Sequence, residues 1–156
     1  MQASAVWSSP PAPSLSRRRG AAAFEAAVAL PVFLLILFGL LDLSLAILRR
    51  NSLCECARRA ARLAIVRGEK ASSPLGPAGW SGTGADDHPV TDAIRGLLTT
   101  MPPDRVRVEI LWPDSGNRVG QRLQVRLRFA HESVLSGLFG TEPWNLSAIS
   151  TMRIAH

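Results

Sequence analysis

The strongest hydrophobic signal in the chain is a nearly uninterrupted apolar run from Ala26 to Leu41. With its small and apolar flanks this run forms a segment over residues 21–48, which as a helix extends about 40 Å at about 1.5 Å per residue. The hydrocarbon core of a bilayer needs about 20 helical residues. The pattern therefore predicts a transmembrane helix over residues 21–48.

A cleaved secretory signal is the alternative interpretation of this run. Such signals carry an apolar region of about 7–15 residues and a small-residue cleavage site soon after it. Here the run is longer, and Leu48 leads directly into Arg49 and Arg50 without such a site. We expect a retained anchor, preceded over residues 1–20 by a disordered basic leader.

Helical periodicity continues after the predicted span. Over residues 49–67 one leucine and several alanines recur at helical spacing, and most charged side chains lie elsewhere. We expect an amphipathic stalk helix that packs this small apolar face against its own head. The residues of the face are Leu53, Ala57, Ala60, Ala61 and Ala64.

A loop and a short helix are predicted next. Residues 68–89 contain many turn formers and no apolar periodicity, so we expect a loop there. Over residues 90–101 apolar side chains recur at helical spacing, Pro89 suits the first turn, and Pro102-Pro103 ends the helix. The apolar positions of this helix are Val90, Ala93, Ile94, Leu97, Leu98 and Met101.

The remaining segments alternate between apolar and polar residues. A turn-rich stretch over residues 113–120 separates two alternating segments and predicts an antiparallel hairpin. A last strand over residues 144–154 is expected to place Trp144 in the core, as the hairpin places Trp112. The inward positions of the hairpin are Val106, Val108, Ile110 and Trp112 in its first strand, and Leu123, Val125, Leu127 and Phe129 in its second.

Together these elements predict an α+β protein. A long N-terminal helix forms the transmembrane segment and the stalk, and a small extracytoplasmic head follows over residues 90–156. The head is expected to contain a three- to four-stranded antiparallel sheet and one short helix. The apolar face of that sheet needs a cover, and the stalk and the short helix are the elements available for it.

The net charge of +6 does not indicate nucleic-acid binding once its position is considered. Up to Lys70 the chain has ten basic residues against four acidic ones, and from Ala71 onward eight stand against eight. The basic excess therefore flanks the apolar run, as in attachment to anionic lipid. We expect membrane lipid as a partner and no nucleic acid. The flanking arginines are Arg17, Arg18, Arg19, Arg49 and Arg50.

No catalytic, metal or cofactor site is expected. His88, His131 and His156 are scattered along the sequence, and phosphate-binding or nucleophile motifs are lacking. Cys54 and Cys56 point about 200° apart on a helix at about 3.6 residues per turn, so they cannot bridge each other there. We interpret them as small helix residues, with an intermolecular disulfide or a lipid attachment as the alternative.

Two groups of charged residues leave alternatives open. Asp42 lies near the far end of the predicted span; we expect it to reach the interface, and a salt bridge to a neighbouring subunit is the alternative. Arginines recur on the outward faces of the predicted strands, where a solvated face with local acids and an acidic ligand both fit. The second option makes the protein a membrane-tethered extracytoplasmic binding module. These arginines are Arg105, Arg107, Arg122, Arg126 and Arg128.

The N-terminal segment carries a recognisable signature. It consists of the arginines at 17–19, Gly20-Ala-Ala-Ala-Phe-Glu25, Pro31 within the apolar run and Phe38-Gly39 near its middle. This segment, the Arg58–Arg62 stalk and the closing strand resemble the TadE-like family, the pseudopilin-like proteins of the tight-adherence (Flp, type IVc) pilus and secretion machinery. One departure is that Ala26 follows Glu25, where the family commonly has an aromatic residue.

The resemblance implies a non-enzymatic assembly protein of the bacterial inner membrane. It implies a single-pass topology with a cytoplasmic N-terminus and an extracytoplasmic head, which the two basic flanks alone do not decide. A prepilin peptidase would cut after Gly20, which frees the amine of Ala21 and makes Glu25 the fifth residue of the mature chain. Other pseudopilins and pilus-assembly proteins are the implied partners.

Overall fold

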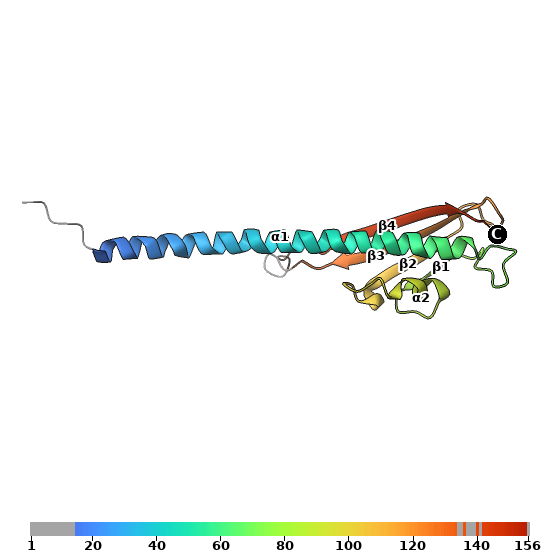
Figure 1. The fold of residues 1–156 in the computed structure, drawn as a ribbon, viewed down its shortest axis with the longest axis horizontal. Helices are drawn as coiled ribbons and strands as arrows, with labels where there is room; N and C mark the ends of the chain where they lie inside the picture. The colour runs from blue at the N-terminus through green and yellow to red at the C-terminus, as the bar shows by residue number, and fades with distance from the viewer. Residues whose placement is uncertain (1–14, 134–135, 137–139, 141, 156) are drawn as a thin grey trace, which may run out of the picture. The chain divides into compact units, whose positions relative to one another are not determined.

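The computed structural model describes residues 15–133, 136, 140 and 142–155, with side chains described from Gly20 onward. The chain divides into two units, Met1–Phe38 and Gly39–His156, and the first helix contributes to both. The elements labelled in Figure 1 are α1 Leu15–Ile65, β1 Trp80–Thr83, α2 Pro89–Arg95, β2 Val106–Leu111, β3 Arg122–His131 and β4 Trp144–Arg153, and a 3₁₀ turn over Pro103–Arg105 precedes β2.

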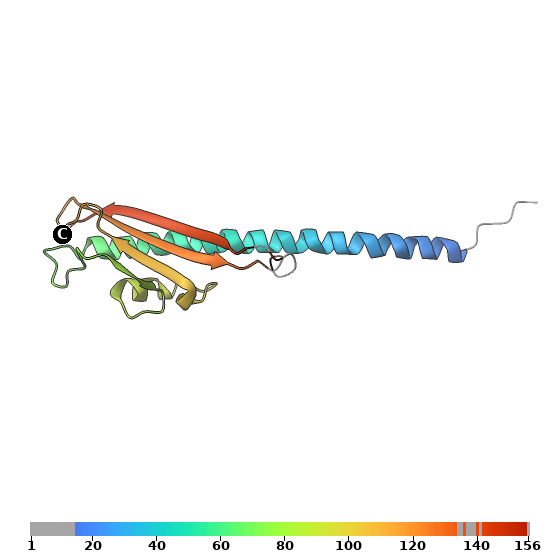
Figure 2. The same cartoon turned by 180° about the vertical axis from the view of Figure 1, so that it is seen from behind.

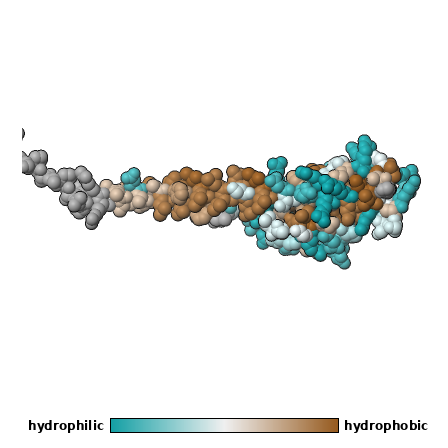
Figure 3. Space-filling view, in the orientation of Figure 1, coloured by the Kyte–Doolittle hydropathy of each residue, from teal (hydrophilic) through white to brown (hydrophobic). Residues whose placement is uncertain are grey.

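The described part of the first unit is helical. Side chains from Gly20 to Phe38 are exposed, and α1 contains a stretch long and apolar enough to cross a membrane. Figure 3 shows this segment as a brown, hydrophobic surface. Because α1 begins at Leu15, the expected disordered leader is wrong for residues 15–20, where arginine favours the helix. Residues 1–14 of that leader lie outside the described residues.

The second unit contains a four-stranded antiparallel sheet in the order β1-β2-β3-β4. The predicted hairpin is confirmed, with Val108 opposite Leu127 in β2 and β3. β1 lies inside the segment 68–89 that was expected to be a loop, so that expectation is wrong for residues 80–83. Four residues that include Gly82 are too short a strand to show the alternation on which the prediction depends.

The core lies between one face of the sheet and the covering helices. The alternating residues predicted to face inward in β2 and β3 are buried, as is the alanine face of α1. Figure 2, seen from behind, shows the strands in front of α1. The small side chains let α1 lie close to the sheet, and α2 adds Val90 and Ile94 to the same core.

Two local predictions fail. The short helix was expected over residues 90–101 but ends at Arg95, because the N–H groups of Leu97 and Leu98 bond to the carbonyls three residues back, not four. Leu98 and Met101 are still buried, although they lie in turns. Trp112 is buried as expected, whereas Trp144 is 48% exposed, because it begins β4 at one end of the sheet.

Candidate assembly and anchoring sites

Gly20 and Ala21 lie near the start of α1 and are exposed. A Cβ atom at Gly20 would meet nothing within 4 Å, so packing does not require glycine there. Glycine costs about 1 kcal/mol relative to alanine inside a helix, and this cost makes local unwinding easier. A peptidase must unwind the helix around the Gly20–Ala21 bond before it can cleave that bond. A glycine at position 20 therefore favours cleavage at the predicted position.

Glu25 borders an apolar stripe on the exposed helix. Val28, Ala29 and Val32 follow it at helical spacing and line the same shallow surface, together with Phe24, Phe33 and Ile36. No ion pair involves Glu25 among the described side chains. A carboxylate costs about 2.5–3.5 kcal/mol at a bilayer centre and less near its edge, so such a group is stabilised by a positive partner or by the interface.

A second polar cluster joins α1 to the end of the sheet. The Arg49 guanidinium donates from Nε to the carbonyl of Thr100 at 3.1 Å and lies 2.6 Å from Nδ1 of His131. Its central carbon is 5.3 Å from the centroid of the Phe129 ring. One arginine thus holds a turn and the end of β3 against the helix. Arg49, predicted only as a membrane flank, therefore also packs within the head, while Arg50 is exposed.

Asp42 also takes part in this junction and lies about two helical turns before Arg49 in α1. Its carboxylate accepts a hydrogen bond from the Ser133 hydroxyl, and the residue is only 5% exposed. The expectation that Asp42 reaches the interface is therefore wrong, because Ser133, which lies just after β3, covers it. On the buried side of α1, the contact with the head thus begins at Asp42, although Leu43, Ile47 and Leu48 remain exposed on the other side.

His131 is fully buried between these groups. Burial, and then the positive charge of Arg49, lower the pKa of His131 below its usual 6.5. A neutral ring suits the geometry, because Nδ1 must accept the proton that the Arg49 guanidinium donates. The Nε2 atom has no hydrogen-bond partner among the described residues. The cluster therefore favours the uncharged imidazole.

The two cysteines differ in exposure. Cys56 is fully buried in the core, and burial raises the pKa of its thiol to about 11, with the negative charge of Glu55 as the next cause. A buried thiol that stays protonated is a poor partner for disulfide exchange, so the structure contradicts an intermolecular disulfide through Cys56. Cys54 is partly buried, and its pairing stays a prediction.

Four of the five arginines predicted on the outer face of the sheet form ion pairs with local acids, and the fifth, Arg107, forms none among the described residues. Glu109 lies 3.6 Å from both Arg126 and Arg128, and Asp114 lies 2.6 Å from Arg122. Arg105 pairs with Glu132 at 3.2 Å. These ion pairs support a solvated face rather than a site for an acidic ligand.

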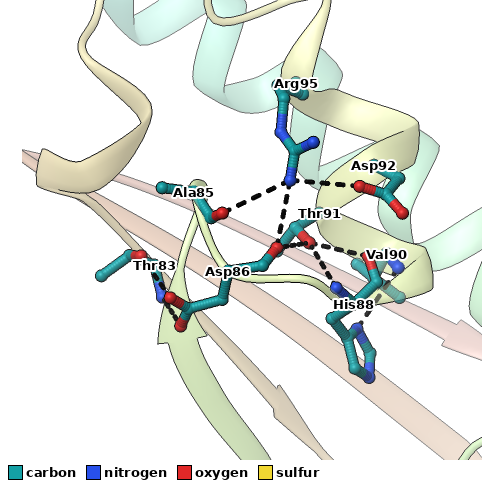
Figure 4. Close-up of polar contacts among 8 residues, drawn as sticks. All are labelled: Thr83, Ala85, Asp86, His88, Val90, Thr91, Asp92 and Arg95. Atoms are coloured by element: carbon teal, nitrogen blue, oxygen red, sulfur yellow. Dashed lines mark hydrogen bonds and ion pairs between the residues drawn. The ribbon is translucent and has the colours of Figure 1, made fainter.

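The connection between β1 and α2 is a closed polar network, shown in Figure 4. The Asp86 carboxylate accepts from the backbone N–H and the hydroxyl of Thr83 at 2.8 and 3.0 Å. These two hydrogen bonds lower the pKa of Asp86. His88 accepts from the Val90 N–H and stacks on Trp80 at 4.2 Å, so this histidine caps α2. These polar groups therefore have a structural role, which is to hold the connection between β1 and α2.

The junction formed by Arg49, Thr100, His131 and Ser133 was not predicted from the sequence. The available signal was Asp42, an acid near the end of an apolar run, but its partner is 91 residues away in the sequence. No group of three metal-ligating side chains occurs within the described part of the chain. Gly20, Ala21 and Glu25 lie along the first unit, apart in sequence from the junction.

Comparison with known proteins supports the resemblance. A family model described as TadE-like protein matches residues 20–62, from the predicted cleavage position into the stalk. The resemblance to the TadE-like family is confirmed over these residues. No curated protein and no solved structure shows a significant match to the chain.

We expect Arg49→Met to lower the free energy of unfolding of the head by about 1.5–3 kcal/mol, since it removes hydrogen bonds from a charged donor. Arg50→Met is the matched control, and an exposed substitution of this kind stays within about 0.5 kcal/mol. Urea unfolding of the full-length protein in detergent, followed by near-ultraviolet circular dichroism, measures both. Equal stability of the two variants would contradict the role given to Arg49.

We expect acid to destabilise the head through His131. Its pKa is lower in the folded than in the unfolded state, so the unfolded state binds more protons, and stability falls as the pH drops below the ordinary value of 6.5. His131→Gln, which accepts from Arg49 without titrating, should flatten the pH dependence of the unfolding midpoint. Burial and then Arg67 also lower the pKa of His88, so that histidine accounts for the remaining slope. An unchanged slope in His131→Gln would refute the assignment.

Proposed function

We propose that the protein is a non-enzymatic, membrane-anchored, pseudopilin-like assembly component of a tight-adherence (Flp, type IVc) pilus or of a related secretion system. The observation that carries this proposal is the TadE-like match over residues 20–62. It begins at Gly20, includes Glu25, and continues through the exposed apolar helix into the stalk. A signal, an anchor and a small α+β head are the parts that such an assembly protein needs.

The proposed location is the bacterial inner membrane, with the N-terminus in the cytoplasm and the head outside. The single candidate span in the described residues fits one membrane crossing. The arginines at 17–19 precede this span, and Arg50 follows it as an exposed residue available to lipid phosphates. The orientation rests on the family resemblance, because both flanks are basic.

The proposed processing step is hydrolysis of the Gly20–Ala21 peptide bond by a prepilin peptidase. The new α-amine of Ala21 is positive at neutral pH, since its reference pKa is about 8. In an assembly of several subunits, the Glu25 carboxylate of one subunit meets this amine on its neighbour. In a low-dielectric medium the pair offsets the cost of burying either charge alone, so it favours one register between subunits.

The function is tested by deleting the gene and complementing the deletion. We expect loss of surface pili and adhesion, restoration by the unchanged gene, and no restoration by Glu25→Gln, which inserts normally but lacks the charge. Glu55→Gln is the control, because Glu55 is an exposed stalk carboxylate outside the signal. Electron microscopy counts the pili. Unchanged pili in the deletion strain would refute the function, and full restoration by Glu25→Gln would refute the role of the carboxylate.

Processing and orientation are tested on the purified protein and on a fusion. Mass spectrometry should find a chain that begins at Ala21 when the peptidase is active, and Gly20→Val should accumulate the precursor without disturbing packing, because no atom lies near a Cβ at that position. A periplasm-active phosphatase fused after residue 156 should be active. A wild-type chain that still begins at Met1, or a silent fusion, would contradict the corresponding step.

A further inference from the structure

The sheet has two edges, and the first is closed. β1 spans only four residues, and its outward-facing backbone positions are Ser81 and Thr83, because the adjacent Gly84 N–H bonds inward to the Val106 carbonyl. Asp86 occupies both groups of Thr83: its carboxylate accepts from the Thr83 N–H, and its own N–H donates to the Thr83 carbonyl at 3.2 Å. Figure 4 shows the carboxylate bound to Thr83. A short edge that is occupied in this way offers little to another strand.

The opposite edge, β4, is long and regular. All ten of its residues pair with β3 in continuous register, from His131 opposite Trp144 to Arg122 opposite Arg153. The Ile154 N–H bonds inward to the Gln121 carbonyl, so alternate residues from 153 backwards direct their N–H and C=O groups away from β3. No further strand pairs with this edge among the described residues. The outward residues are Asn145, Ser147, Ile149, Thr151 and Arg153.

β4 also lacks the features that normally protect an edge. Natural edge strands carry charges, prolines or bulges, or are covered by another element. From Trp144 to Met152 this strand contains no charged residue and no proline, and its ladder has no bulge. Ile149 is 54% exposed on it. Among the described residues, the outward backbone is occupied only beyond the strand, where the Ala155 N–H bonds to the Ile65 carbonyl of α1.

We propose that the outer edge of β4 is a docking site for an extended, uncharged segment of a different assembly protein, which adds to the sheet as a fifth, antiparallel strand. Main-chain hydrogen bonds to the five outward residues supply affinity. Isoleucine and hydroxyl side chains on the exposed face select an apolar or hydroxyl-bearing segment. This inference deepens the proposed function and rests on it, since it names the surface through which the head would join the assembly.

A second copy of the chain does not fit this edge as an antiparallel strand. β4 runs in the same direction as α1, because its start lies opposite His131, which contacts Arg49, and its end leads to Ala155, which contacts Ile65. Antiparallel pairing of β4 with itself would put the membrane-proximal ends of the two stalks at opposite ends of the dimer, which one membrane does not allow. Pairing with β1 of another copy meets the edge closed by Asp86.

The experiment uses full-length protein in the deletion strain. Ser147→Pro removes an outward N–H of β4 and leaves the bonds to β3 in place, as proline on an edge strand can. Ser81→Pro makes the same change on the closed edge and is the matched control. We expect Ser147→Pro to reduce pilus number at least about tenfold and Ser81→Pro to leave it near wild type. Ile149→Lys, which adds a charge to the edge without proline, should act like Ser147→Pro.

A photo-crosslinking amino acid at position 149 identifies the occupant. The expected product joins β4 to a strand segment of another pseudopilin-like protein, identified by mass spectrometry, and Ser147→Pro abolishes it. A product that joins two copies of this chain through β4, a product that survives Ser147→Pro, or normal piliation by a folded Ile149→Lys would each overturn the proposal. If deletion itself leaves pili intact, the proposed function fails; if deletion removes pili and Ser147→Pro restores them, the edge proposal fails alone.

Discussion

The second unit depends on burial of the apolar face of its sheet by α1. A sheet of this size with one exposed apolar face is not stable in water, and removing such area from solvent stabilises it by about 25 cal/mol per Å². α1 meets this need with alanines: Ala57, Ala60, Ala61 and Ala64 are at most 1% exposed. Their small volume lets the helix backbone approach the strands. The sheet therefore supplies the large side chains of the core, and the helix supplies small ones.

The same constraint explains why polar residues cluster at the junction between α1 and the end of the sheet. Where the alanine face ends, the helix still lies against the head, and the backbone and side-chain polar groups there need partners. Arg49 provides them for the Thr100 carbonyl and for His131, and Ser133 provides one for Asp42. Charged and aromatic contacts thus continue an interface that begins as close apolar packing.

The two edges of the sheet differ in how well they are protected against pairing with another strand. The edge formed by β1 is short and bound to its own loop through Asp86, whereas the edge formed by β4 is long, uncharged and regular. Edge protection usually prevents association with another strand. Because β1 is protected and β4 is not, another strand can join the head only at the β4 edge. On the outer face between them, Glu132 pairs with Arg105 and Glu109 is shared by Arg126 and Arg128, which suits exposure to solvent.

The sequence by itself determined the features that depend on local periodicity. The apolar run, the alanine face and the alternation in β2 and β3 each repeat often enough to identify a helix or a strand, and Gly20 with Glu25 is a signature read along one helix. The tertiary structure alone decided what depends on distant contacts: β1, the end of the short helix at Gly96, the burial of Asp42 and Cys56, and the exposure of Trp144. A four-residue strand has too little periodicity to be predicted, and Asp42 is buried where Ser133, 91 residues later, lies against it.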